Sequence, residues 1–170
     1  MSDRGGPAIV SRRIGAAYQV FAEGGAGYLN GGPKHITFGS HVDAVLAYKP
    51  TVVVIFGSRN DSYFPKAQTE AAVTRVLDRL RAGLPNAKIV VVGPAWWLAA
   101  PPPGDATAAV SAVQAASAQA GVPFTDPVAL KWLPADAPEW IGKDHIHPND
   151  TGHRHLADLM QRVLHEDGVG

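Results

Sequence analysis

Short, largely apolar runs alternate along this chain with longer segments whose apolar residues recur at helical spacing. Residues 51–56 (TVVVIF) and 87–92 (AKIVVV) are bounded by turn-forming residues, which predicts strands covered on both faces of a parallel sheet. Residues 17–22 (AYQVFA) are predicted as a third strand, and residues 122–125 as a short fourth one. These strands would supply the centre of the fold.

Four segments are predicted as helices. Residues 66–82 place apolar side chains at helical spacing with charges on the other side, and Gly83 follows as a C-terminal stop. Residues 149–165 begin with Asn and Asp, which commonly cap helix N-termini. The other two helices are expected over residues 105–120 and 7–14. Alternation of strands and helices favours an α/β fold with a doubly wound parallel sheet.

Composition narrows the function classes. The chain has 170 residues without a repeat or a linker, so we expect a single domain over residues 1–170. Lys plus Arg and Asp plus Glu both number 15, which gives no support for binding nucleic acid or an anionic membrane. The absence of cysteine excludes disulfides, thiolate metal sites and cysteine nucleophiles.

Membrane, targeting and cofactor signals are also absent from the pattern. No apolar run approaches the roughly 20 residues that a spanning helix needs. The first seven residues contain no apolar signal segment, so the sequence as it stands predicts no signal peptide and leaves the localisation open between cytoplasmic and secreted. We expect no cofactor.

The strongest candidate for chemistry is Asp144 with His147, in the run KDHIHPND that precedes the last predicted helix. An acid three residues before a histidine can orient the imidazole, so that its second ring nitrogen acts as a general base. The structural alternative is an acid that caps the helix and a histidine on the surface, because so short a pattern is common by chance. The following proline, asparagine and glycine make the pattern more specific.

Two further candidates follow predicted strands. Asn60 lies just beyond the strand at residues 51–56, where its carboxamide could donate to a developing oxyanion. Gly25 lies in the glycine-rich stretch after residues 17–22, where a backbone N–H could do the same. Each also has a purely structural explanation, a turn for Asn60 and a flexible loop for Gly25. In parallel sheets, ligands bind at the carboxyl ends of the strands, so we expect these loops to lie close to the Asp144 loop.

Together, these residues closely resemble the SGNH (GDSL-type) hydrolase family, whose four sequence blocks supply Ser, Gly, Asn and His. The last block matches DHIHPN strongly, and the third matches FGSRND except that Ser58 replaces the family's usual glycine. The resemblance implies a flavodoxin-like three-layer fold and ester hydrolysis through a Ser-His-Asp triad. By this resemblance His147 is the general base, Asp144 orients it, and Asn60 with Gly25 forms the oxyanion hole.

The family's first block, a strand ending in Gly-Asp-Ser, is missing, so the fold would lack its first strand and the site its nucleophile. Ser2 is nearest in order, but Gly25 follows it by only 23 residues and no predicted strand precedes it. Ser11, Ser40 and Ser58 fit less well, because Ser11 is predicted in a helix, Ser40 in a loop, and Ser58 at the position of the family's glycine. Two explanations are open. Either the coding sequence continues upstream of Met1, or the chain is a natural variant that has lost the strand and its chemistry.

The predicted function is an esterase or acetylesterase acting on a small-molecule ester or an acylated carbohydrate. The first alternative is a non-catalytic binding module that retains the pocket. The second is a metal-dependent hydrolase, since four histidines fall within eleven residues: His145, His147, His153 and His155. Trp96, Trp97, Trp132 and Trp140 could line the substrate pocket or pack on the core, and the sequence leaves the oligomeric state open.

Overall fold

A computed structural model describes residues 5–102 and 104–169. The chain divides into two compact units, each built from several stretches of sequence. Unit 1 comprises Met1–Val20, Trp96–Pro101 and Val128–Gly170, and unit 2 comprises Phe21–Ala95 and Pro102–Pro127. The single domain expected over the whole chain stays a prediction.

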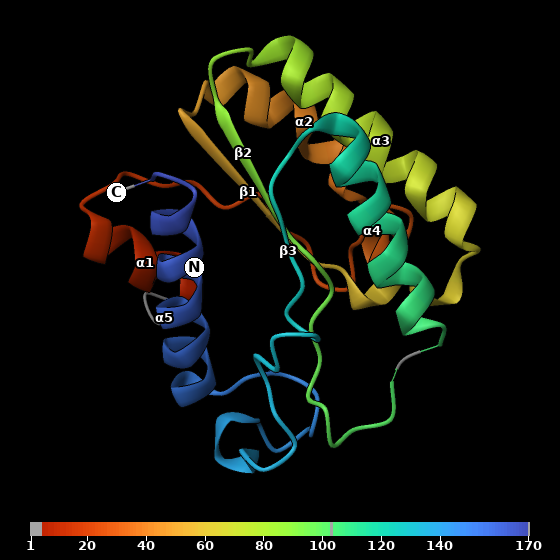
Figure 1. Cartoon of the computed structure of the whole chain (residues 1–170), viewed down its shortest axis with the longest axis vertical. Coiled ribbons are helices and arrows are strands. Elements are labelled where there is room, and N and C mark those ends of the chain that lie inside the picture. The colour runs from red at the N-terminus through yellow and green to blue at the C-terminus, as the bar shows by residue number, and fades with distance from the viewer. Residues whose placement is uncertain (1–4, 103, 170) are drawn as a thin grey trace. The chain divides into compact units, whose positions relative to one another are not determined.

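Unit 2 is built on a parallel sheet of three strands, β1 (Val52–Phe56), β2 (Lys88–Val92) and β3 (Phe124–Thr125), in the order β1-β2-β3 (Figure 1). Val53 of β1 lies opposite Ile89 of β2, and the register continues along both strands. Four residues of β2 are buried because β2 is the central strand. Strands β1, β2 and β3 confirm the strands predicted at residues 51–56, 87–92 and 122–125.

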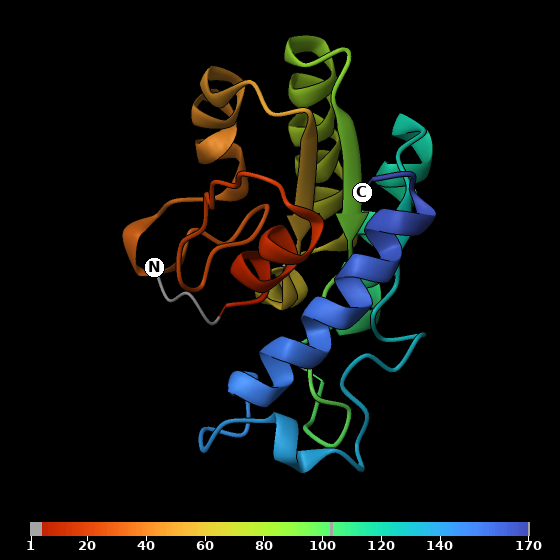
Figure 2. The ribbon, with the colours of Figure 1, turned by 90° about the vertical axis from the view of Figure 1, so that its left-hand side faces the viewer.

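Three helices accompany this sheet, α2 (Phe38–Tyr48), α3 (Lys66–Gly83) and α4 (Ala106–Ala120) (Figures 1 and 2). Helix α3 packs against both α2 and α4. The glycine at the end of α3 permits this packing, because a Cβ on Gly83 would lie 2.5 Å from a methyl group of Leu46 in α2. The hydrophobic core of unit 2 gathers apolar residues of the strands and helices: Tyr28, Val42, Val53, Ile55, Ala72, Val73, Val76, Leu77, Leu80, Leu84, Ile89, Val91, Val113, Ala116 and Val122.

Unit 1 contains the first and last helices, α1 (Gly6–Ile14) and α5 (Asp150–Glu166), which pack against each other. Arg13 near the end of α1 forms an ion pair with Asp158 of α5. The described residues also form three short 3₁₀ helices: η1 (Gly32–Lys34) and η2 (Arg59–Tyr63) in unit 2, and η3 (Pro138–Trp140) in unit 1.

The helices predicted at residues 7–14, 66–82, 105–120 and 149–165 are confirmed to within one or two residues at each end. The strand predicted at residues 17–22 is wrong. This segment is irregular, since a strand forms only beside a partner and no described strand pairs with it.

The sequence prediction also missed α2. Ser40 therefore lies in a helix rather than a loop, where its hydroxyl accepts a hydrogen bond from the Thr37 N–H at 3.1 Å. Gly83 does not follow α3 as a stop but is its last residue, and Leu84 is the C-cap.

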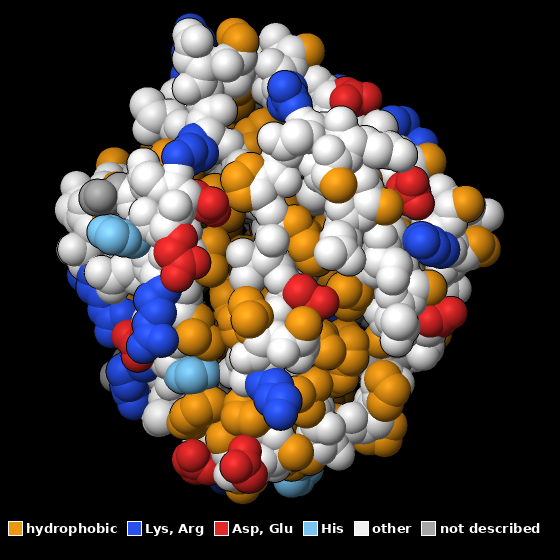
Figure 3. Space-filling model, in the orientation of Figure 1, with side chains coloured by type: hydrophobic (Ala, Val, Ile, Leu, Met, Phe, Trp, Pro, Cys, Tyr) orange, Lys and Arg blue, Asp and Glu red, His pale blue; other side chains and the backbone are white. Residues whose placement is uncertain are grey.

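One face of the molecule is mixed in charge (Figure 3). On the face shown in Figure 3, basic and acidic side chains are interspersed among polar and apolar ones. Among the described residues, no helix is both long and apolar enough to cross a membrane. The expectation that the protein binds no nucleic acid stays a prediction.

Candidate active site

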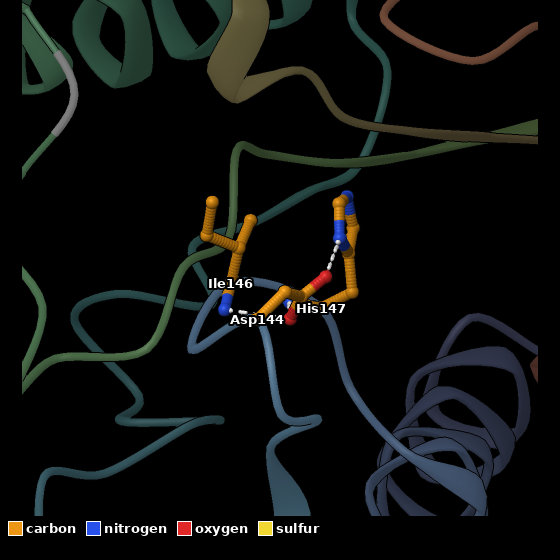
Figure 4. Close-up of polar contacts among 3 residues, drawn as sticks. All are labelled: Asp144, Ile146 and His147. Atoms are coloured by element: carbon orange, nitrogen blue, oxygen red, sulfur yellow. Dashed lines mark hydrogen bonds and ion pairs between the residues drawn. The ribbon is translucent and has the colours of Figure 1, made fainter.

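Asp144 and His147 form a close pair in unit 1 (Figure 4). The Asp144 carboxylate lies 2.6 Å from Nδ1 of His147. Its other oxygen accepts the backbone N–H groups of Ile146 and His147, each at 3.0 Å. The imidazole is 78% exposed, so the ring nitrogen that does not face Asp144 is open to a substrate or a nucleophile.

The pair is presented by a short hairpin. Ile141 and Pro148 form an antiparallel bridge, and the Gly142 N–H donates to the carbonyl of His147 at 2.7 Å. Residues 143–146 make the turn, in which His145 adopts a left-handed backbone conformation with φ of 55°. The turn places Asp144 and His147 on the same side of the hairpin, at hydrogen-bonding distance (Figure 4).

Asn149 joins this hairpin to α5. Its side-chain oxygen accepts the N–H groups of Thr151 and Gly152, which caps the helix as the sequence predicted. Its side-chain amide donates to the carbonyls of Glu139 (2.8 Å) and Ile141 (3.1 Å). One asparagine thus fixes the start of the helix against the segment leading into the hairpin.

Gly152 in the first turn of α5 lets the helix approach this segment. A Cβ at this position would lie 2.1 Å from the carbonyl oxygen of Trp140 and 2.9 Å from Cβ of Pro148. The Pro-Asn and Gly that strengthened the sequence pattern therefore have structural roles beside His147.

Hydrogen bonding determines the electrostatics of the pair. The backbone N–H of His147, the imidazole of His147 and the N–H of Ile146 stabilise the ionised carboxylate and hold the pKa of Asp144 well below its usual range. Burial lowers the pKa of His153 on α5, and Asp150 opposes this effect. The lowered pKa of Asp144 means that its carboxylate stays ionised well into the acidic range.

Asn60 and Gly25 lie together in unit 2. The Asn60 side-chain amide donates to the carbonyl of Ala26, the residue after Gly25, at 2.8 Å. The Ser58 hydroxyl donates to the same carbonyl at 2.9 Å and accepts the Asn60 N–H at 3.0 Å. Ser58, which replaces the glycine usual in the family, thus connects the two loops.

Gly25 has the backbone conformation expected of a glycine that exposes its N–H. Its φ is 77°, a value that favours glycine, and the residue is exposed. Among the described residues, no acceptor for the Gly25 N–H is found. The second hydrogen of the Asn60 amide is likewise not used by Ala26, so both groups can donate to a ligand.

Asp61 holds this arrangement together, a role that the sequence did not reveal. Its carboxylate is 1% exposed and accepts the N–H groups of Tyr28 (2.7 Å), Leu29 (3.0 Å) and Asn30 (3.0 Å). A Cβ on Gly27 would lie 2.5 Å from both carboxylate oxygens, so only glycine fits there. In the sequence, the only sign of this role was an acid directly after Asn60. Its partners could not be predicted, because they lie more than 30 residues away.

No described serine stands out as a nucleophile, because each lies in a helix or caps one. The hydroxyls of Ser11, Ser58 and Ser117 donate to nearby backbone carbonyls, and Ser40 belongs to the N-terminal cap of α2. Ser2, the nearest in order to the family's nucleophile, lies outside the described residues.

The four histidines between residues 145 and 155 occupy different surroundings. His145 stacks with Trp97 at a centroid distance of 6.2 Å, and His155 stacks with Trp140 at 3.7 Å. Among the described residues, no group of three or more histidine, aspartate or glutamate side chains could hold a metal ion. Of the four tryptophans, Trp96 and Trp132 are buried and pack inside unit 1.

Comparison with known proteins now identifies the family. The model of the GDSL-like lipase/acylhydrolase family matches residues 1–155. The chain belongs to this family. A GDSL lipase of Mycobacterium tuberculosis is 34% identical over 165 residues, which cover 95% of this chain and 71% of that protein.

Solved structures share the fold of the family. An acetyl xylan esterase matches with a TM-score of 0.75 and 18% identity, over 96% of this chain and 92% of its own. A psychrotrophic esterase from Pseudoalteromonas matches with a TM-score of 0.72 and 18% identity, over 96% and 87% respectively. The predicted α/β class with a parallel sheet is thus confirmed, and its three described strands fit the core of this fold.

Proposed function

We propose that this protein hydrolyses carboxylic esters by acyl transfer to a serine, with His147 as the general base. The observation that carries the proposal is the 2.6 Å contact between Asp144 and Nδ1 of His147, with the rest of the imidazole exposed. Membership of a lipase and acylhydrolase family supports the reaction type. The esterases among the structural neighbours favour a small-molecule ester or an acylated carbohydrate as substrate.

In the proposed mechanism, each group takes the role that its chemistry allows. Asp144 keeps the proton of the neutral imidazole on Nδ1, so Nε2 of His147 carries the lone pair that accepts the serine proton. The serine oxygen bonds to the ester carbon and forms a tetrahedral oxyanion, which the Asn60 amide and the Gly25 N–H stabilise. His147 then gives the proton to the leaving alcohol, and a water molecule activated by His147 releases the acid.

The Asn60 contribution is tested by hydrolysis of p-nitrophenyl acetate. We expect Asn60→Ala to lower kcat by about two to three orders of magnitude, the loss typical of one oxyanion donor. Asn86→Ala is the matched control, since Asn86 is exposed in the turn before β2. Unchanged turnover by the Asn60 variant of an active protein would remove Asn60 from the mechanism.

The nucleophile is identified by labelling with a fluorophosphonate, followed by mass spectrometry of the peptides. The described serines lie in helices or their caps, and Ser2 lies outside the described residues, so the identity of the nucleophile is left to this experiment. Replacing the labelled serine by alanine should abolish labelling, and His147→Ala should slow it strongly. If no serine is labelled and no ester is hydrolysed, the protein is instead a non-catalytic binding module.

A further inference from the structure

His155 is one of the histidines that the proposed reaction does not use, and it makes both a hydrogen bond and a ring stack. It lies in the second turn of α5 and is partly buried. Its Nε2 is 2.8 Å from the carbonyl oxygen of Trp132. Because a carbonyl oxygen only accepts, this ring nitrogen carries a proton and donates it.

The ring of His155 also lies directly on the indole of Trp140. Their centroids are 3.7 Å apart, and the planes are inclined by 21°. Trp140 is the last residue of η3 and directly precedes the hairpin that presents Asp144 and His147. The stack thus connects the second turn of α5 to the beginning of this hairpin.

Trp140 is tied to the other end of the hairpin as well. Its carbonyl accepts the Asn149 N–H at 2.9 Å, and Asn149 caps α5. The segment leading into the hairpin is therefore attached to α5 at two places, at the N-cap through Asn149 and in the second turn through His155. With two attachment points, the segment cannot rotate about either one relative to α5, as it could with a single attachment.

We propose that His155 is a positioning residue, which acts through its stack on Trp140 to hold His147 at hydrogen-bonding distance from Asp144. The proposal rests on the role proposed above for His147, but its test has a readout that needs no turnover. Asp144 favours the imidazole tautomer with the proton on Nδ1. A free imidazole in water favours the other tautomer, so the tautomer of His147 reports how well the hairpin is held.

The experiment separates the stack from the hydrogen bond with two variants of the whole chain. His155→Phe keeps an aromatic ring on Trp140 and removes the donor to Trp132. His155→Gln keeps a donor and removes the ring. His165→Gln is the matched control, because His165 is exposed in the last turn of the same helix.

The tautomer of His147 is read from long-range ¹H–¹⁵N spectra of histidine-labelled protein, with circular dichroism to confirm folding. We expect His155→Gln to shift His147 towards the Nε2–H tautomer, whereas His155→Phe and His165→Gln leave it as in the parent. In ester hydrolysis, His155→Gln should lower kcat about tenfold while KM stays within about twofold, as expected when a catalytic group is misplaced.

An unchanged tautomer in folded His155→Gln overturns the proposal, as does a shift in His155→Phe equal to that in His155→Gln. If the parent hydrolyses no ester but the tautomer shifts as expected, the positioning role stands and the proposed reaction fails. The two proposals are thus decided separately.

Discussion

At the scale of single residues, Asp144 determines what His147 can do. Its carboxylate makes three contacts, two with backbone N–H groups and one with the imidazole. The first two shape the turn, and the third orients the ring. An asparagine at this position keeps one oxygen for the two backbone N–H groups but presents an amide to Nδ1. The substitution therefore preserves the turn and removes only the contact that orients the imidazole.

We expect Asp144→Asn to lower kcat by roughly two to four orders of magnitude with little change in KM, because the imidazole loses its orienting anion. The measurement is steady-state hydrolysis of p-nitrophenyl acetate. Asp136→Asn serves as the control, since Asp136 is an exposed acid of the same unit. Equal activity of the parent and Asp144→Asn would mean that the pair is structural.

The lowered pKa of Asp144 has a consequence for the pH profile of the parent. A carboxyl group whose pKa is depressed in the folded protein stays ionised above that pKa and loses its charge only as the pH falls through it. Protonation of Asp144 should therefore not contribute to the loss of activity at acidic pH. In a plot of the logarithm of kcat/KM against pH, the acidic limb should have a slope of one. A slope of two would show that Asp144 titrates in this range as well.

At the scale of elements, the sequence predicted what periodicity and burial determine locally. Strands β1 and β2 are apolar on successive residues, and α3 repeats its apolar residues at helical spacing. Helix α2 was missed because it is short and its first turn contains Gly39 and Ser40, which are poor helix formers. The strand predicted at residues 17–22 failed because pairing depends on a partner elsewhere in the chain.

The same distinction explains the candidate site. Asp144 and His147 are three residues apart, so their contact could be predicted from the sequence. The contacts of Asp61 with residues 28–30 depend on the folded loops and could not. The link from Asn60 to Ala26 is also long-range, and the resemblance to the family indicated its two loops without predicting this hydrogen bond.

Asp61 gives the element scale its own prediction. The buried carboxylate accepts three backbone N–H groups, whereas an asparagine offers one oxygen and directs an amide at the remaining donors. Asp61→Asn should lower the free energy of unfolding by about 3 kcal/mol, measured by denaturant titration. Asp78→Asn on the exposed side of α3 is the control, and an equal, small effect of both variants would contradict the anchoring role.

At the scale of the whole molecule, the two units differ in how they are stabilised. The residues of the hydrophobic core cluster all lie in unit 2, where three strands and three helices share them. In unit 1, by contrast, the buried residues lie where α1 packs against α5 and in the loops beside these two helices. The proposed base His147 therefore belongs to the unit with the smaller apolar interior, and the proposed oxyanion donors to the unit with the larger one.

Native-state hydrogen exchange tests this difference. Because local stability follows the density of buried apolar contacts, the amides of β2 and α3 should exchange roughly 100-fold more slowly than those of α1 and α5. The comparison uses amides hydrogen-bonded within each element, so that solvent exposure of the ends does not decide the result. If the two groups exchange at the same rate, the two units unfold together and do not differ in local stability. If the difference is found, His155 and Asn149 should matter more than core residues of unit 2 for holding that hairpin, since they attach it to α5 within the less stable unit.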